Sequence, residues 1–338
     1  MSLNSRIPTG TQNDGGRTLT KTYPGGSAAN RPTSFSVGLR GDPSTFADFI
    51  RLAEDLGFNG IWTQDTLNDK NFSLDPLHQL SYAAGISKHM RLGISVLFSG
   101  YRNPAVLARD LATIDQLSQG RLTVGMGVGN AYHRPRLAAL GIPTDKPTVR
   151  LVEGIAVMRA LWAEGEADFD GEIYSFSGIR MQPKPVQQPG PPIIIGARSE
   201  PALRRAVAIA DGWTGAAMIP AEERDQEMAI LRDELAVSGR DPASFSISVN
   251  VYAAVEPTRE EARDRVQQIL SVGFKDNPVY SVEGMADRVA VFGPPEECAE
   301  GLRKLIAKGV DEIVLHPMYD HPNQLKQLAK AVELVKRA

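Results

Sequence analysis

Short apolar runs alternate with longer segments of helical period from Ser34 to the end of the chain. In the first cycle, an apolar run at residues 35–39 is followed by Asp42 and Pro43, which supply an N-cap and a first-turn proline for a helix. Apolar side chains then recur every three or four residues over 46–56, and Gly57 ends the helix. This alternation is typical of βαβ units and predicts a parallel sheet.

Eight strand segments of this kind are expected, with helices between them. They lie at residues 35–39, 60–64, 92–98, 121–126, 193–196, 212–216, 245–255 and 312–315. Thr258 and Glu261 have the spacing of a capping box, whereas residues 274–292 have no clear assignment. Eightfold alternation over this length favours a closed (β/α)₈ TIM barrel over an open doubly wound sheet. Residues 38–43 also lack the glycine spacing of a dinucleotide-binding loop.

The alternation is interrupted between residues 168 and 192. Asp170-Gly171, Ser177-Gly178 and several prolines predict a small hairpin and an extended loop in this insertion. We therefore expect one barrel domain over residues 34–338. Residues 1–33 are rich in Gly, Ser, Thr and Asn and have no apolar run of the kind that signal peptides contain, so a flexible tail is expected there.

Composition narrows the class of protein. A formal net charge of -3, with both signs interspersed over 338 residues, gives no basic stripe for nucleic acid or anionic lipid. Neither nucleic acid nor membrane is therefore an expected partner. The single cysteine, Cys298, cannot form an internal disulfide or a multi-thiolate metal site, which fits the reducing cytoplasm.

In a barrel, the chemistry belongs at the carboxyl ends of the strands. The polar, aromatic and glycine residues expected there are Arg40, Asp42, Gln64, Asp65, Thr66, Phe98, Ser99, Gly100, Tyr101, Arg102, Gly127, Gly129, Asn130, Tyr132, His133, Gly196, Arg198, Ser199, Asn250, Tyr252 and His316. This set contains no metal-ligand motif, no nucleophile elbow and no closely spaced carboxylate pair. We therefore expect a bound cofactor to supply the chemistry.

Two segments of this rim suit a cofactor. Gly125, Gly127 and Gly129 would let the backbone approach a flat ring, although glycines after a strand are as often turn formers. Residues 196–201 lead from a strand into a helix N-terminus that would hold a phosphate. Alternatively, Ser199 is a simple N-cap and Arg198 a solvated surface charge.

Several stretches together resemble the luciferase-like monooxygenase superfamily, in particular its bacterial luciferase-like and F420-dependent branch. They are Ala53-Glu54-Asp55-Leu56-Gly57-Phe58 with Trp62 and Asp65, and residues 102–108, 117–122, 125–129, 183–185, 191–193 and 210–213. The resemblance implies a (β/α)₈ barrel with an insertion, which binds FMN or coenzyme F420 and often forms a homodimer.

The resemblance also implies roles for single residues. A non-proline cis peptide at Ser95-Val96 would support the ring, residues 127–130 would border it, and His133 would reach its polar edge. The phosphate would contact residues 196–199. The cofactor set is Asp65, Ser95, Val96, Phe98, Gly127, Gly129, Asn130, His133, Gly196, Ala197, Arg198 and Ser199.

Two departures affect the expected activity. Relatives that act on sugar phosphates or alcohols carry a histidine and a glutamate where this chain has Thr66 and Asn130. Proton transfer is then expected from His133, His316, Tyr101 or Tyr132, or from water. We expect F420-dependent hydride transfer to or from a small, moderately hydrophobic organic substrate.

Other functions stay open. One is an FMN-dependent monooxygenase that uses O₂ and a separate flavin reductase, and another is a flavin-binding homologue without activity. An unrelated barrel hydrolase or lyase would need a carboxylate, lysine or metal set at the strand ends, which Asp65 alone does not provide.

Overall fold

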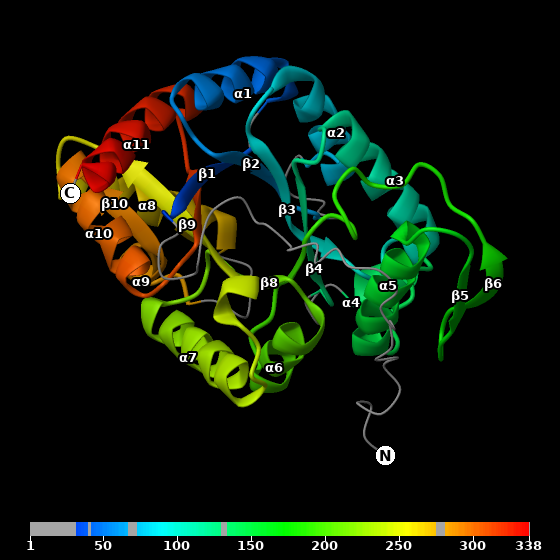
Figure 1. Cartoon of the computed structure of the whole chain (residues 1–338). Helices are drawn as coiled ribbons and strands as arrows, with labels where there is room; N and C mark the ends of the chain where they lie inside the picture. Colours follow the sequence, from blue (N-terminus) through cyan, green and yellow to red (C-terminus); the bar gives the residue numbers. More distant parts are fainter. Residues whose placement is uncertain (1–31, 40–41, 67–72, 130–133, 275–280, 338) are drawn as a thin grey trace.

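The computed structural model describes residues 32–39, 42–66, 73–129, 134–274 and 281–337. Strands form the centre of the molecule and helices surround them (Figure 1). The barrel strands are β1 (Ser34–Gly38), β2 (Gly60–Thr63), β3 (Arg91–Phe98), β4 (Leu122–Gly127), β7 (Ile193–Ile195), β8 (Gly212–Gly215), β9 (Ser246–Val255) and β11 (Glu312–Pro317). They are parallel and pair in this order, and β11 pairs with β1, which closes the predicted eight-stranded barrel.

The surrounding helices follow the expected alternation. They are α1 (Phe46–Asp55), α2 (Pro76–Ile86), α3 (Pro104–Leu117), α4 (Arg134–Ala139), α5 (Pro147–Trp162), α6 (Glu200–Ile209), α7 (Ala221–Val237), α8 (Arg259–Phe274), α9 (Met285–Val289), α10 (Pro295–Ala307) and α11 (His321–Lys336). Short 3₁₀ helices at Pro43–Thr45 and Pro242–Ser244 precede α1 and β9. Asp42 caps the first of these, so α1 begins three residues later than its proline suggests.

The insertion forms the predicted hairpin. Strands β5 (Ala167–Asp170) and β6 (Ser175–Ile179) pair antiparallel in a sheet of their own. The hairpin lies outside the ring of helices, beside α5 (Figure 1). The segment without a sequence assignment contains α9 and a further strand, β10 (Ala290–Gly293), which pairs with residues 252–255 of β9.

The amino-terminal half of the barrel interior is filled. Trp62, Ile194 and Val314 form a buried cluster, and because their strands are not neighbours they meet across the interior. Trp62 occupies the space opposite Gly93, where a Cβ would lie 2.2 Å from the indole. Its Nε1 donates to Oε1 of Glu312 at 2.9 Å. These side chains therefore fill the barrel interior at this level.

Candidate functional site

The rim between the ends of β3 and β4 holds a small pocket with a volume of about 20 Å³. Its lining is mainly apolar and comes from Phe98, Ser99, Gly100, Tyr101, Val128, Gly129, Arg134, Leu137, Pro143, Thr144, Pro147 and Arg150. The rings of Phe98 and Tyr101 meet edge to face, with centroids 5.0 Å apart. The structure thus brings two predicted site residues together in one wall, and α4, which the sequence pattern did not predict, forms another.

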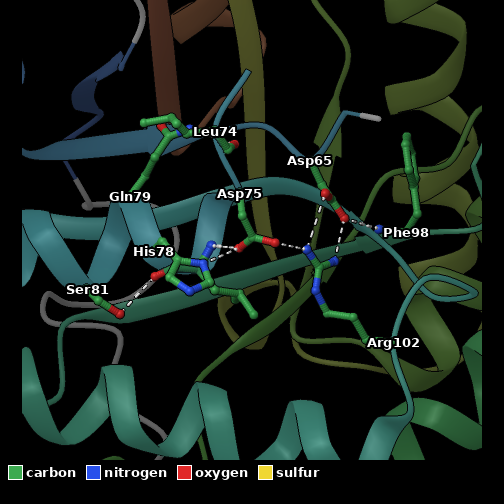
Figure 2. Close-up of polar contacts among 9 residues, drawn as sticks. Asp65, Leu74, Asp75, His78, Gln79, Ser81, Phe98 and Arg102 are labelled. Carbon is green, nitrogen blue, oxygen red and sulfur yellow. Dashed lines mark hydrogen bonds and ion pairs between the residues drawn. The ribbon is translucent and has the colours of Figure 1, made fainter. Parts of the chain in front are cut away.

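Asp65 follows β2 and is tied to the end of β3 (Figure 2). Its Oδ2 accepts from Nη1 of Arg102 at 2.8 Å and from the backbone N–H of Phe98 at 3.3 Å. Only 8% of Asp65 is exposed, and burial raises the pKa of its carboxyl against the opposing effect of Arg102. Asp65 therefore holds in place the backbone of Phe98, which lines the pocket. The sequence predicted that Asp65 binds cofactor, whereas these contacts give it a supporting role.

Arg102 also joins a second carboxylate, that of Asp75, which is the N-cap of α2. Its Nη2 lies 2.6 Å from Oδ2 of Asp75, and the other Asp75 oxygen accepts the N–H of Leu77 as the cap of α2 (Figure 2). Burial alone would raise the pKa of Asp75, but Arg102, His78 and this N–H together hold it below its usual value. The guanidinium thus links the ends of β2 and β3 to the start of α2.

The predicted cis peptide is present between Ser95 and Val96. Val96 packs against glycines of the two next strands, because a Cβ on Gly127 or Gly196 would lie 2.9 or 3.0 Å from its side chain. A Cβ on Gly125 would lie 2.2 Å from the carbonyl oxygen of Ile94. The glycine pattern therefore reflects close packing of β3 on β4 and β7 as much as room for a ring.

Gly129 has a different reason to be glycine. Its φ is 75°, in the left-handed region that side chains other than glycine rarely adopt. The turn after β4 is thus shaped by this residue, as the turn-forming interpretation predicts. Asn130, Tyr132 and His133 lie outside the described residues, so their predicted roles stay predictions.

The strand-to-helix turn at residues 196–199 leads from β7 into α6. Ser199 occupies the N-cap position without a side-chain capping bond, so the simple N-cap interpretation does not account for its hydroxyl. Arg198 is half-exposed and pairs with two carboxylates of α7, with Nε 3.1 Å from Oε1 of Glu227 and a further contact to Glu223. Arg198 is therefore already held in ion pairs beside the proposed phosphate site.

His316 lies deeper than the sequence suggests. It is 1% exposed and sits inside the barrel with Ser95, Thr214 and Asn250, three polar side chains from other strands. The sequence signal for this cluster was a polar residue, Asn250, within the buried apolar run of β9. Thr214 was missed because an isolated threonine in a strand is common.

Two kinds of feature are absent from the residues that the structure describes. No group of three or more His, Cys, Asp or Glu residues there is arranged to hold a metal ion. No helix in this part of the chain has the length and apolar character needed to cross a membrane.

Known proteins share both the sequence pattern and the fold. The luciferase-like monooxygenase family matches residues 22–312. The 5,10-methylenetetrahydromethanopterin reductase of Archaeoglobus fulgidus is 26% identical over 303 residues, which cover 79% of this chain and 87% of the reductase. The F420-dependent glucose-6-phosphate dehydrogenase of Microbacterium testaceum is 25% identical over 312 residues, or 86% and 92% of the two chains.

Among solved structures, the monooxygenase RslO1 from Streptomyces bottropensis matches with a TM-score of 0.78 at 24% identity, over 90% of this chain and 100% of RslO1. This structural match confirms the barrel, and the family match covers most of the chain. The chain therefore belongs to the luciferase-like monooxygenase family and is an enzyme of the oxidoreductase class.

Proposed function

We propose that this chain is a coenzyme F420-dependent oxidoreductase that transfers a hydride to or from a small organic substrate. One arrangement carries the proposal: an apolar pocket at the ends of β3 and β4 shares the barrel rim with the N-terminus of α6. The apolar lining gives a hydrophobic surface at the rim, and a helix N-terminus suits a cofactor phosphate. Similarity to the F420-dependent dehydrogenase of Microbacterium testaceum supports a deazaflavin in preference to FMN.

The residues at the start of α6 fit the phosphate of such a group. At the start of α6, the hydroxyl of Ser199 makes no capping bond, and Arg198 adds a cation. A helix N-terminus with a hydroxyl and a guanidinium is a suitable set of donors for a phosphate.

The chain's own residues would orient the substrate and exclude water. When bound, the deazaflavin supplies two-electron hydride chemistry. Phe98, Tyr101 and Leu137 give the pocket apolar walls, which favour a moderately hydrophobic substrate. Among the described lining residues, Tyr101 carries the phenol suited to proton transfer, whereas the buried His316 does not line the pocket.

A parallel titration of the purified protein with F420 and with FMN, followed by ring fluorescence, tests the cofactor assignment. Tight binding of F420 alone supports the proposal and directs the substrate search to carbonyl, imine and alkene compounds. Preference for FMN would contradict it in favour of a monooxygenase with a separate reductase. Binding of neither would favour a homologue without activity.

Two arginine variants test the phosphate site. Arg198→Gln removes a guanidinium next to the N-terminus of α6, and Arg204→Gln removes one from the body of the same helix, where it pairs with Glu200 and Glu234. A hydrogen bond to a charged group contributes about 1.5 to 3 kcal/mol, so Arg198→Gln should weaken F420 binding about tenfold or more. Arg204→Gln should leave it unchanged, and equal affinities for both variants would contradict this site.

The homodimer and the cytoplasmic location stay predictions from the sequence. The predicted flexible tail falls almost wholly on residues 1–31, which lie outside the described residues. A flavin reductase is an expected partner only if FMN is the cofactor.

A further inference from the structure

Asn250 is the centre of the polar cluster inside the barrel. It projects from β9 and is 3% exposed. Its Nδ2 lies 3.0 Å from Oγ of Ser95 on β3 and 3.1 Å from Oγ1 of Thr214 on β8. Its Oδ1 lies 2.8 Å from Nε2 of His316 on β11. One amide therefore connects three other strands of the barrel.

A fourth contact fixes which way this amide points. The Nδ2 of Asn250 lies 3.0 Å from the backbone carbonyl oxygen of Gly215. A carbonyl oxygen can only accept, so the atom facing it must be the NH₂ group. The reversed amide would place two acceptor oxygens against each other in a buried site, where neither finds water.

The amide orientation in turn determines where His316 carries its proton. Because Oδ1 of Asn250 is an acceptor, the Nε2 atom that faces it at 2.8 Å must be a donor. In the neutral imidazole, Nδ1 then carries the lone pair. This assignment follows from the Gly215 carbonyl and not from a choice of hydrogen positions.

The ring of His316 is also held from the opposite side. A Cβ on Gly38 of β1 would lie 2.1 Å from Nδ1 and 2.5 Å from Cε1 of His316. The imidazole thus occupies the space that a side chain at position 38 would take. With Asn250 on β9 and Gly38 on β1, the ring has one orientation.

We propose that Asn250 is a positioning residue of the site: it fixes His316 as the Nε2–H tautomer and orients the Ser95 hydroxyl beneath the cofactor ring. The role of Ser95 next to the ring rests on the proposed function. Ser95 precedes Val96, whose side chain packs against Gly127 and Gly196 of the rim. A change in the bonding of Asn250 therefore reaches the surface against which the ring would lie.

The tautomer is tested on the wild-type protein without cofactor. ¹⁵N NMR of histidine-labelled protein distinguishes a protonated ring nitrogen from one with a lone pair, and His316→Gln identifies the signals among the five histidines. We expect a proton on Nε2 and none on Nδ1. A proton on Nδ1, on both nitrogens or exchanging between them would overturn the tautomer assignment.

The link to the ring is tested with two variants of β9. Asn250→Asp keeps an acceptor for His316 but loses the NH₂ contacts to Ser95, Thr214 and Gly215. Ser248→Ala is the matched control, because Ser248 is equally buried and its Oγ has no hydrogen-bond partner among the described residues.

Outer-shell partners of metal sites typically contribute 10–100-fold to affinity, and by analogy we expect Asn250→Asp to weaken F420 binding about tenfold. Ser248→Ala should stay within about twofold of the wild type, because it removes a hydroxyl that makes no hydrogen bond among the described residues and leaves no partner unpaired. Equal affinities for both variants would overturn the positioning role. Failure of the wild type to bind F420 or FMN would instead refute the proposed function. The NMR result would still decide whether Asn250 fixes His316 as the Nε2–H tautomer.

Discussion

Replacing Arg102 with methionine would leave the Asp65 carboxylate buried without its cation. The side chains of Asp65 and Arg102 are 6% and 19% exposed, and the two charged atoms lie 2.8 Å apart. Removing one partner of a buried ion pair costs about 3 to 5 kcal/mol. The half-exposed contact of Arg102 with Asp75 adds at most about 1 kcal/mol. We therefore expect the free energy of unfolding to fall by about 3 kcal/mol at pH 8.

This loss should depend on pH. Burial already raises the folded-state pKa of Asp65, and removal of Arg102 raises it further because the guanidinium acts in the opposite direction. The pKa of an aspartate in the unfolded state is about 3.9. When the pKa in the folded state is higher, the free energy of unfolding falls as pH rises from the lower pKa to the higher one, by up to about 1.4 kcal/mol per pH unit. The loss should therefore be small near pH 4 and reach its full size only once pH exceeds the raised pKa.

Urea unfolding followed by tryptophan fluorescence measures this at pH 4.5 and pH 8. The control is Asp65→Asn, which removes the charge that needs Arg102 and keeps the shape of the side chain. In that background, Arg102→Met should cost less than about 1 kcal/mol, the usual size of the remaining surface contact. An equal loss at both pH values, or the full loss in the Asp65→Asn background, would refute the reasoning.

Three further predictions rest on single contacts. Gly38→Ala places a Cβ 2.1 Å from His316, so we expect a loss of about 3 kcal/mol in urea unfolding, and wild-type stability would contradict the packing. Burial raises the pKa of Glu312, so ionisation of this carboxyl lowers the free energy of unfolding as pH rises. Glu312→Gln should therefore be more stable than the wild type at pH 8 but not at pH 4. Burial also raises the pKa of the Cys298 thiol to about 12, so a thiol reagent at pH 8 should label it only as the chain unfolds in urea. Fast labelling of the native protein would show that the thiol is accessible.

Features that depend on residues near each other in the chain could be predicted from the sequence. Asp75 and Asn103 bond to N–H groups two residues away, so the starts of α2 and α3 were predictable. The same holds for Thr258, which caps α8 through the N–H of Glu261 at 3.3 Å. Eight repeats of this local pattern then left a closed barrel as the expected fold, and the barrel placed the site at the strand ends.

The contacts of the rim residues could not be predicted from the sequence, because they depend on how the strands are arranged in the barrel. Arg102 and Asp65 are 37 positions apart and meet because β2 and β3 are neighbours in the sheet. Ser95 and Asn250 are 155 positions apart, on strands that are not neighbours, and they meet only because the barrel closes. The glycines show the difference most clearly. The sequence indicated that Gly125 and Gly127 leave room for something, and the structure shows Ile94 and Val96 in that room. A missing side chain marks a close approach, but the partner in that approach depends on which strands become neighbours.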